Sequence, residues 1–346
     1  MSEVTEAEVL QALRAVQDPD LHKDVVSLGF VKDVKICGPA VKFTLELTTP
    51  ACPVKDQLKE QARQAVAALD GVETVNVNLT AQVKSSLGPS DLLGDRVRNV
   101  IAVTSGKGGV GKSTCAVNLA VALARQGAKV GLLDADVYGP NVPIMMGIEG
   151  RPSPGTNQKI APKEAHGVKT MSIGYMVEDG TPVMWRGPML HRALEQFLQD
   201  VDWGELDYLL VDMPPGTGDA QISLAQLVPM TGAVVVTMPQ EVSLTDVRRA
   251  IAMCQQVKCE ILGVIENMSG EVFGRGGGHK TAEAFGVPLL GEVELDPKIR
   301  AGGDRGEPIT ISDPDTEAGR RFAHIAGQMA AKVATRQIQS LPVLEV

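Results

Sequence analysis

A glycine-rich run with two lysines constrains the fold of this chain more than any other feature. It consists of Gly106, Lys107, Gly108, Gly109, Val110, Gly111, Lys112, Ser113 and Thr114. The run satisfies G-x-x-x-x-G-K-[ST], a pattern in which backbone N–H groups close around phosphate oxygens. The apolar segment 99–105 before it predicts a buried strand, and residues 113–126 after it predict a helix. Strand, loop and helix in this order are the context that the motif needs.

The motif gives its side chains separate roles. We expect Lys112 to reach the β- and γ-phosphates of a nucleotide, and the Ser113 hydroxyl to ligate Mg2+. The helix that follows adds the positive end of its dipole. The sequence therefore predicts a nucleotide-binding domain, and the alternative is a glycine-rich turn without a ligand.

A second lysine, Lys107, stands at the start of the same loop. The string K-G-G-V-G-K-S-T resembles the deviant P-loop of the MinD/ParA/NifH class of dimeric ATPases. The resemblance implies a homodimer in which Lys107 crosses the interface and contacts the partner's nucleotide. There it would stabilise charge on the transferred phosphoryl group, as an arginine finger does. The alternative is a solvated loop lysine.

Composition and charge narrow the function classes. The 346 residues are 44% hydrophobic and carry 33 Lys and Arg against 42 Asp and Glu, a net charge of -9. This acidic balance argues against a general nucleic-acid binder. No apolar stretch approaches the ~20 residues of a membrane span, and the acidic N-terminus lacks the layout of a signal peptide. Because the five cysteines are scattered and odd in number, we expect a reduced, cytoplasmic protein without nucleic-acid or membrane partners.

The chain divides at residues 85–98, where Ser, Gly and Pro without periodicity predict a linker. Residues 1–84 predict a small α+β domain. Its helices are expected at 6–16 and 54–69, and its strands at 30–36, 41–47 and 72–79.

Residues 99–346 alternate strands and helices. The strands are nearly continuous apolar runs, which indicates a doubly wound, mostly parallel α/β sheet covered on both faces. We expect strands at 100–104, 129–133, 208–211, 233–237 and 261–265, and helices at 189–198, 220–227, 243–257 and 316–338. The last helix has Phe322, Ile325, Met329 and Val333 on one face, which favours packing on its own domain over binding to a membrane.

Two acidic loops follow strands of this sheet. Asp134 and Asp136 follow the strand 129–133, and Asp212 and Gly216 follow the strand 208–211. Carboxylates at the carboxyl ends of strands beside a P-loop suit magnesium coordination, directly or through water. We therefore expect Asp134 and Asp212 to bind the metal and Asp136 to orient the attacking water. Gly216 would offer its N–H to the γ-phosphate and move on hydrolysis. The alternative for each aspartate is a helix cap or turn.

Longer segments resemble the Mrp/ApbC family, within a match from about residue 99 to 295. These segments are 105–119, 133–143, 185–189, 212–219 and 266–270. The resemblance implies a homodimeric ATPase that binds iron–sulfur clusters and passes them to apoproteins. It also places Asn267 at the adenine-contacting position, where an amide can donate to and accept from the base edge.

The small domain supports the same assignment. Residues 18–21, 27–31 and 47–53 resemble the PaaD/SufT-type domain of iron–sulfur assembly factors. Cys52 lies in the last of these segments, just before a predicted helix, where a thiolate would be stabilised and reactive. A small buried cysteine is the alternative.

The sequence departs from the family in one respect. Most Mrp-type proteins carry a C-x-x-C shortly after the Asn-Met-Ser motif, and the two copies in a dimer hold a bridging cluster. Here Asn267-Met268-Ser269-Gly270 continues through Glu271-Val272-Phe273 without a cysteine, so the usual thiolate ligands are missing. Cys254 and Cys259 are the nearest substitutes, but on one continuous helix they would point about 140° apart.

We therefore expect an ATP-hydrolysing carrier or assembly factor for iron–sulfur clusters. It would use ATP and Mg2+, and its partners would be apoprotein clients and iron–sulfur assembly proteins. Two alternatives stay open: a positioning or partitioning ATPase of MinD/ParA type, and a scaffold ATPase that does not itself hold a cluster.

Overall fold

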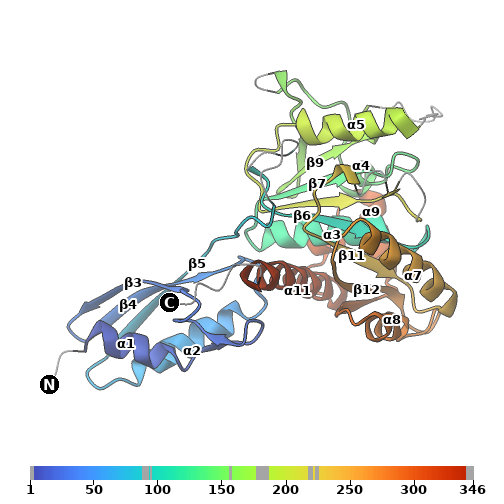
Figure 1. Ribbon diagram of the computed structural model, residues 1–346. Coiled ribbons are helices and arrows are strands. Elements are labelled where there is room, and N and C mark those ends of the chain that lie inside the picture. Colours follow the sequence, from blue (N-terminus) through green and yellow to red (C-terminus); the bar gives the residue numbers. More distant parts are fainter. Residues whose placement is uncertain are drawn as a thin grey trace. The chain divides into compact units, whose positions relative to one another are not determined.

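The structure is a computed structural model that describes residues 4–87, 93, 96–155, 158–176, 187–216, 221–222 and 226–339 (Figure 1). The chain falls into two compact units. One contains Met1–Lys84 together with Ala330–Val346, and the other contains Ser85–Met329. No helix in the described ranges combines the length and apolar character needed to cross a lipid bilayer.

The N-terminal unit is a three-stranded sheet covered by two helices. Strands β3 (Val31–Cys37), β4 (Ala40–Leu47) and β5 (Thr74–Ala81) lie in that order, with β3 antiparallel and β5 parallel to β4. Helices α1 (Glu6–Leu13) and α2 (Lys55–Ala67) pack against them around Phe43 and Leu58. Thr5 and Glu8 form a capping box that fixes the start of α1. Two short strands, β1 (Gln17–Asp18) and β2 (Lys23–Asp24), pair between α1 and β3.

The larger unit is built on an eight-stranded sheet with the order β13-β12-β11-β6-β10-β7-β9-β8 among the described residues. Every neighbouring pair is parallel except β8 with β9. The strands are β6 (Val100–Thr104), β7 (Val130–Asp134), β8 (Lys163–Ala165), β9 (Val168–Ser172), β10 (Tyr208–Asp212), β11 (Gly232–Thr237), β12 (Ile261–Ser269) and β13 (Leu289–Glu294).

Helices flank this sheet. Helix α3 packs on β7 and β10, α7 on β11, and α8 on β12, and Figure 1 shows α7 and α8 beside β11 and β12. The helices are α3 (Lys112–Arg125), α4 (Val142–Met145), α5 (Gly187–Gln199), α7 (Glu241–Gln256), α8 (Gly277–Phe285), α9 (Pro297–Arg305), α10 (Ile309–Ser312) and α11 (Glu317–Gln339), with a 3-10 turn, η3 (Ile173–Tyr175).

The predicted fold class, a doubly wound and mostly parallel α/β sheet preceded by a small α+β region, is confirmed. The prediction missed β8, β9 and β13. Polar residues interrupt these strands, among them Lys169 in β9 and Glu292 in β13, so they lack the continuous apolar run of a central strand. The predicted helix 220–227 lies partly outside the described residues.

The apolar stripe of the last helix is buried. Phe322, Ile325 and Met329 have no exposed surface and Val333 has 1%. Ile325 lies so close to Gly291 of β13 that a Cβ there would be 2.7 Å from its side chain. The stripe is therefore buried, with Phe322, Ile325 and Met329 belonging to the larger unit as predicted and Val333 to the unit that contains residues 1–84.

Candidate functional site

The glycine-rich run forms a tight loop between β6 and α3. Gly109 and Gly111 both have φ of +80°, a left-handed conformation that favours glycine. Gly111 directly precedes α3, and no side chain caps the first N–H groups of that helix. Open N–H groups at a helix start, together with the loop amides, make a site for phosphate oxygens.

Three charged side chains meet at this loop. Lys112 Nζ donates to Asp212 Oδ1 at 2.6 Å and lies 3.9 Å from Asp136 Oδ2. Asp212 is fully buried, and Lys112 and Asp136 are only 6% and 8% exposed. Burial raises the pKa of the Asp212 carboxyl, and the Lys112 ammonium opposes that rise. The P-loop lysine is thus paired with the carboxylate at the end of β10.

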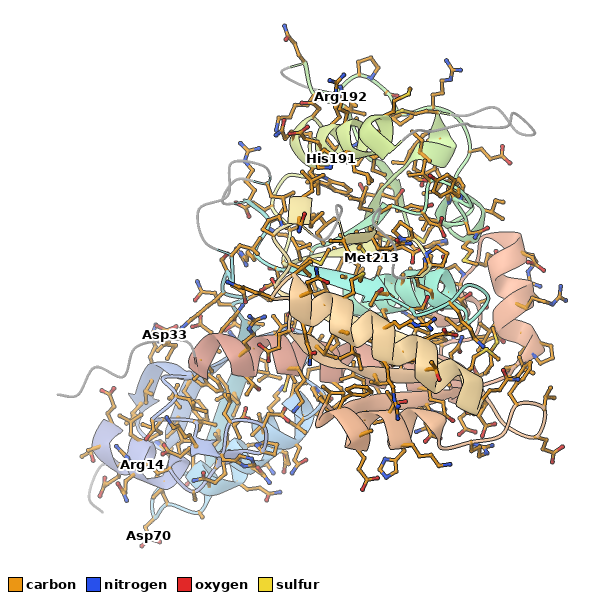
Figure 2. All side chains as sticks on the ribbon, turned by 45° about the vertical axis from the view of Figure 1, so that its right-hand side comes forward. Arg14, Asp33, Asp70, His191, Arg192 and Met213 are labelled. Atoms are coloured by element: carbon orange, nitrogen blue, oxygen red, sulfur yellow. The ribbon has the colours of Figure 1, made fainter. Side chains whose placement is uncertain are left out.

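The chemistry around Asp212 suits a cation. Its second oxygen, Oδ2, is buried and has no hydrogen-bond partner. Ser113 stands one residue along the helix from Lys112, and its Oγ lies 3.3 Å from Lys112 Nζ. The Asp212 carboxylate, whose pKa a hydrogen bond from Ser113 lowers, and the Ser113 hydroxyl form an oxygen set that Mg2+ accepts. Met213, labelled in Figure 2, directly follows β10 and marks this end of the sheet.

Asp134 has a different environment from the one that the sequence suggested. It pairs in register with Asp212 across β7 and β10, but both of its oxygens accept hydrogen bonds from protein donors. Oδ1 accepts from the Asp136 N–H at 3.1 Å, and Oδ2 accepts from the Val142 N–H at 3.3 Å and Ser172 Oγ at 2.9 Å. Burial and the nearby Asp212 charge raise the pKa of Asp134 to about 8. Asp134 therefore holds the loop 135–142, and its predicted role at magnesium, directly or through water, stays a prediction.

Two cavities adjoin the loop. The first, about 180 Å³, is lined by Ser105, Lys107, Gly108, Gly109, Gly111, Lys112, Ser113, Thr114, Asp136, Asn141, Met145 and Pro215. The second, about 170 Å³, is mostly apolar and includes Asn267, Met268, Leu295 and Ile299 in its wall. Thr114 and Met145 line both cavities. A cavity at the P-loop that shares two wall residues with an apolar chamber matches the phosphate and base ends of a nucleotide.

Asn267 lines the apolar chamber and contacts the P-loop. Its Nδ2 donates to the carbonyl of Val110 at 2.9 Å, and a Cβ at Gly111 would overlap the same amide nitrogen. The residue predicted to contact adenine therefore also fixes the P-loop backbone. Gly216 has φ of +95°, and its N–H donates to the Ser105 carbonyl at 3.2 Å, so donation to a phosphate requires this bond to open.

Lys107 is half-buried and lines the phosphate cavity. Within the described part of the chain, no carboxylate forms an ion pair with it. The structure thus leaves its ammonium group available for a negatively charged ligand.

The predicted thiol residues are not at this site. Cys52 is half-buried in the N-terminal unit, three residues before α2 begins, and burial raises the pKa of its thiol to about 11. The expected activation by the helix start is absent because desolvation dominates. Cys254 and Cys259 are buried in the core of the larger unit. At the position of the missing C-x-x-C, Gly270 and Gly274 exchange two hydrogen bonds of 2.8 Å around Glu271, Val272 and Phe273.

The sequence analysis missed two residues that shape the site. Ser172 ends β9 and donates to Asp134, and its signal was a polar residue closing a strand that we did not recognise. Glu266, buried in β12, accepts from the N–H groups of Gly276 and Gly278 at 3.0 and 2.5 Å. It anchors the turn before α8, and only the tertiary fold reveals that contact.

A mostly parallel sheet, a glycine-rich loop between β6 and α3, and a buried lysine–aspartate pair define a P-loop NTPase. Residues 96–330 match the family described as NUBPL iron-transfer P-loop NTPase, and residues 6–79 match the family described as iron–sulfur cluster assembly protein. The chain belongs to this NUBPL-type family, with an assembly-type domain at its N-terminus.

Named relatives align with nearly the whole chain. A Synechocystis protein named iron–sulfur cluster carrier protein is 50% identical, over 94% of this chain and 97% of its own length. A Deinococcus radiodurans protein of the same name is 46% identical, over 96% and 97%. The chloroplastic Fe-S cluster assembly factor HCF101 of Arabidopsis thaliana is 45% identical, over 93% of this chain and 63% of that protein.

Solved structures share the fold. A nucleotide-binding protein from Archaeoglobus fulgidus in complex with ADP is 36% identical with a TM-score of 0.56, covering 63% of this chain and 92% of that one. The cell division ATPase MinD of Pyrococcus furiosus has a TM-score of 0.54 at 23% identity, covering 67% and 98%. The second likeness concerns the fold alone.

Proposed function

We propose that this protein is an ATP-hydrolysing carrier of iron–sulfur clusters that works as a homodimer and delivers clusters to apoproteins. The ATPase activity in this proposal is supported by the complete P-loop and by the buried contact between its Lys112 and Asp212 of β10. Family membership and the names of the relatives support the cargo. Residues 1–84 act as the partner-docking domain, 85–98 as a linker and 99–346 as the ATPase domain.

The site residues divide the work of hydrolysis. Lys112 leaves Asp212 and pairs with the β- and γ-phosphates, which bring more negative charge than one carboxylate does. This exchange frees Asp212 Oδ1 next to the unpartnered Oδ2, so that Ser113 and Asp212 hold Mg2+. When bound, the metal neutralises phosphate charge. Asp136, at 3.9 Å from Lys112 Nζ, orients the attacking water.

The remaining contacts position the nucleotide. The Gly216 N–H exchanges the Ser105 carbonyl for the γ-phosphate and returns after hydrolysis. Asn267 contacts the adenine from the wall of the apolar chamber while its Nδ2 holds the loop at Val110. Lys107 contacts the nucleotide of the partner subunit, and its lack of a carboxylate partner among the described residues supports this role.

ATP turnover by purified variants tests the ATPase part. Wild-type protein releases phosphate from ATP with Mg2+, whereas Lys112→Ala and Lys107→Ala are each slow. A mixture of the two variants regains activity, because one site in a mixed dimer has Lys112 in cis and Lys107 from its neighbour. Lys129→Ala, which removes an exposed lysine paired with Glu205, serves as the unaffected control. Wild-type turnover in Lys112→Ala contradicts the ATPase assignment, and no recovery in the mixture contradicts the trans role.

The cluster itself is cargo and needs thiolate ligands. Without C-x-x-C, we propose Cys52 as a ligand, with Cys254 and Cys259 as the alternative pair. Fewer thiolates make the bound cluster labile. Anaerobic reconstitution of the wild type, Cys52→Ser and the Cys254→Ser/Cys259→Ser double variant, followed by iron and sulfide quantification, locates the ligands. Uptake equal to that of a variant lacking all five cysteines excludes a bound cluster.

The closed turn 270–274 favours a second candidate function. Because it contains no thiol where relatives of the Mrp type hold a cluster, the chain would serve as an ATPase partner in cluster assembly without holding one itself. The reconstitution experiment separates the two functions.

A further inference from the structure

The C-terminus of α7 brings two cysteines together. Helix α7 ends at Gln256, and Lys258 adopts a left-handed conformation with φ of +57°. The N–H of Lys258 donates to the Gln255 carbonyl at 3.0 Å, and the N–H of Cys259 donates to the Cys254 carbonyl at 2.8 Å. This pair of bonds is the Schellman motif, in which the two outermost residues make a side-chain contact. Here both of those residues are cysteines.

This geometry replaces the separation expected from the sequence. A continuous helix would point the two side chains about 140° apart, but the left-handed residue folds Cys259 back over the last turn. The neighbouring Cys259 thiol lowers the pKa of Cys254, and Cys259 Sγ also lies 3.8 Å from the Glu260 carbonyl oxygen. The motif itself therefore holds the two sulfur atoms side by side.

A third sulfur completes the group. The thioether of Met230, just before β11, lies 3.9 Å from Cys259 Sγ. Cys254 and Cys259 are 3% and 6% exposed, whereas Met230 is half-buried. The group lies just under the surface, because Gln255, Gln256, Lys258 and Glu260 next to it are exposed. Met230 is thus the most exposed of the three sulfur-bearing residues.

The sulfur group is remote from the nucleotide site. It lies at the amino ends of β11 and β12, whereas the P-loop follows the carboxyl end of β6 in the same parallel sheet. The sulfur group and the P-loop therefore lie at opposite ends of the parallel strands. Neither cysteine nor Met230 takes part in the proposed hydrolysis, and the two cysteines are only the alternative to Cys52 as cluster ligands.

We propose that Cys254, Cys259 and Met230 form a binding site for monovalent copper. Thiolate and thioether sulfurs are soft donors that select Cu+ over harder divalent ions. No set of three or more His, Cys, Asp or Glu side chains in the described ranges gathers into a metal site, so the donors that zinc prefers are missing around the two thiols. On binding, each coordinating thiol releases its proton to solvent, and the ion keeps its oxidation state.

The alternative is that both cysteines act as small apolar residues closing a helix end. A competition titration separates the two possibilities. Reduced full-length protein is mixed anaerobically with Cu+ held by the coloured chelator bicinchoninate, and withdrawal of copper is followed by absorbance. We expect the wild type to withdraw a stoichiometric amount of Cu+ and the Cys254→Ala/Cys259→Ala variant to withdraw none.

Two milder variants cover the case in which the double variant does not fold. Met230→Leu preserves the volume and apolar character of the side chain, and we expect it to bind Cu+ about tenfold more weakly. Cys115→Ala removes a buried cysteine outside the group and should leave binding unchanged. The proposal is overturned if the wild type withdraws no Cu+ from the chelator. It is also overturned if Met230→Leu and the double variant both bind Cu+ as tightly as the wild type does. The assay contains neither nucleotide nor iron, so its outcome is independent of the proposed ATPase function and of a cluster held by Cys52.

Discussion

Lys112 and Asp212 form a buried ion pair with 2.6 Å between Nζ and Oδ1. The proposed nucleotide would compete with Asp212 for the Lys112 ammonium group. Lys112 is 6% exposed and Asp212 is fully buried. Lys112 therefore pairs with the carboxylate that we propose for the metal. We therefore expect nucleotide and Mg2+ to bind cooperatively. When the phosphates draw Lys112 away, Asp212 is freed for Mg2+, and when Mg2+ binds Asp212, Lys112 is freed for the phosphates.

The pair makes a prediction for stability. Lys112→Ala leaves a buried carboxylate without its cation, and we expect the free energy of unfolding of the nucleotide-free protein to fall by about 3 kcal/mol. Lys112→Ala/Asp212→Asn should lose less than the sum of the single variants, because the second change removes the uncompensated charge. Urea unfolding of the four proteins measures this coupling. Strictly additive losses would show that the two side chains do not interact.

The P-loop glycines make a second prediction. Gly111→Ala forces a side chain into a left-handed conformation, at about 1–2 kcal/mol, and also pushes Cβ into the Asn267 amide. We expect lower thermal stability and lost ATP binding. Gly108→Ala is the matched control for stability, because its φ is ordinary and its nearest neighbour, Pro215 Cβ, is 3.9 Å away. Equal melting temperatures for the two variants would contradict the strain at Gly111.

Ser172 is predicted to act as a positioning residue. Its Oγ donates to Asp134, which in turn holds the Asp136 N–H. Ser172→Ala should loosen the loop 135–142 and lower kcat about tenfold or more, with little change in KM because the P-loop contacts stay intact. Ser172→Thr keeps the hydroxyl and should restore kcat. Steady-state ATPase kinetics measure the split, and a change confined to KM would point to nucleotide binding instead.

Cys52 makes a prediction about pH. Because burial raises the pKa of its thiol to about 11, the reactive thiolate is scarce at pH 7 and increases as pH approaches that value. We expect its alkylation by iodoacetamide to rise about tenfold per pH unit between pH 7 and 9. Peptide mass spectrometry measures the rate, with urea-unfolded protein as the control that levels off earlier. A plateau near pH 7 would restore the helix-activated thiolate that the sequence suggested.

Much of the site was predictable because its chemistry is local. The spacing of Gly106, Gly111 and Lys112 prescribes a loop between a strand and a helix, and the central strands β6, β7 and β10 are continuous apolar runs. The position of Asp212 and Asp136 beside the P-loop could be predicted because parallel strands have their carboxyl ends on the same side of the sheet.

Other features depend on contacts distant in sequence or on unusual backbone geometry. The environment of Asp134 was not predicted because Ser172 lies on β9, an edge-side strand whose mixed composition hid it. The pairing of Cys254 with Cys259 depends on a left-handed residue that is usually glycine or asparagine but here is Lys258. Nothing in a lysine indicates that backbone conformation, so the predicted helix 243–257 gave no sign that Cys259 folds back toward Cys254.

Cluster transfer driven by ATP tests the central claim most directly. Wild-type protein and Lys112→Ala are reconstituted anaerobically with iron and sulfide, desalted and mixed with an apo-ferredoxin. The visible absorbance of the acceptor then reports transfer with MgATP, with MgADP and without nucleotide. The account predicts that both proteins load a cluster, and that only the wild type transfers it faster with MgATP than with MgADP. Transfer by Lys112→Ala at the wild-type rate, or no iron and sulfide on the wild type above a cysteine-free variant, would contradict an ATP-driven carrier.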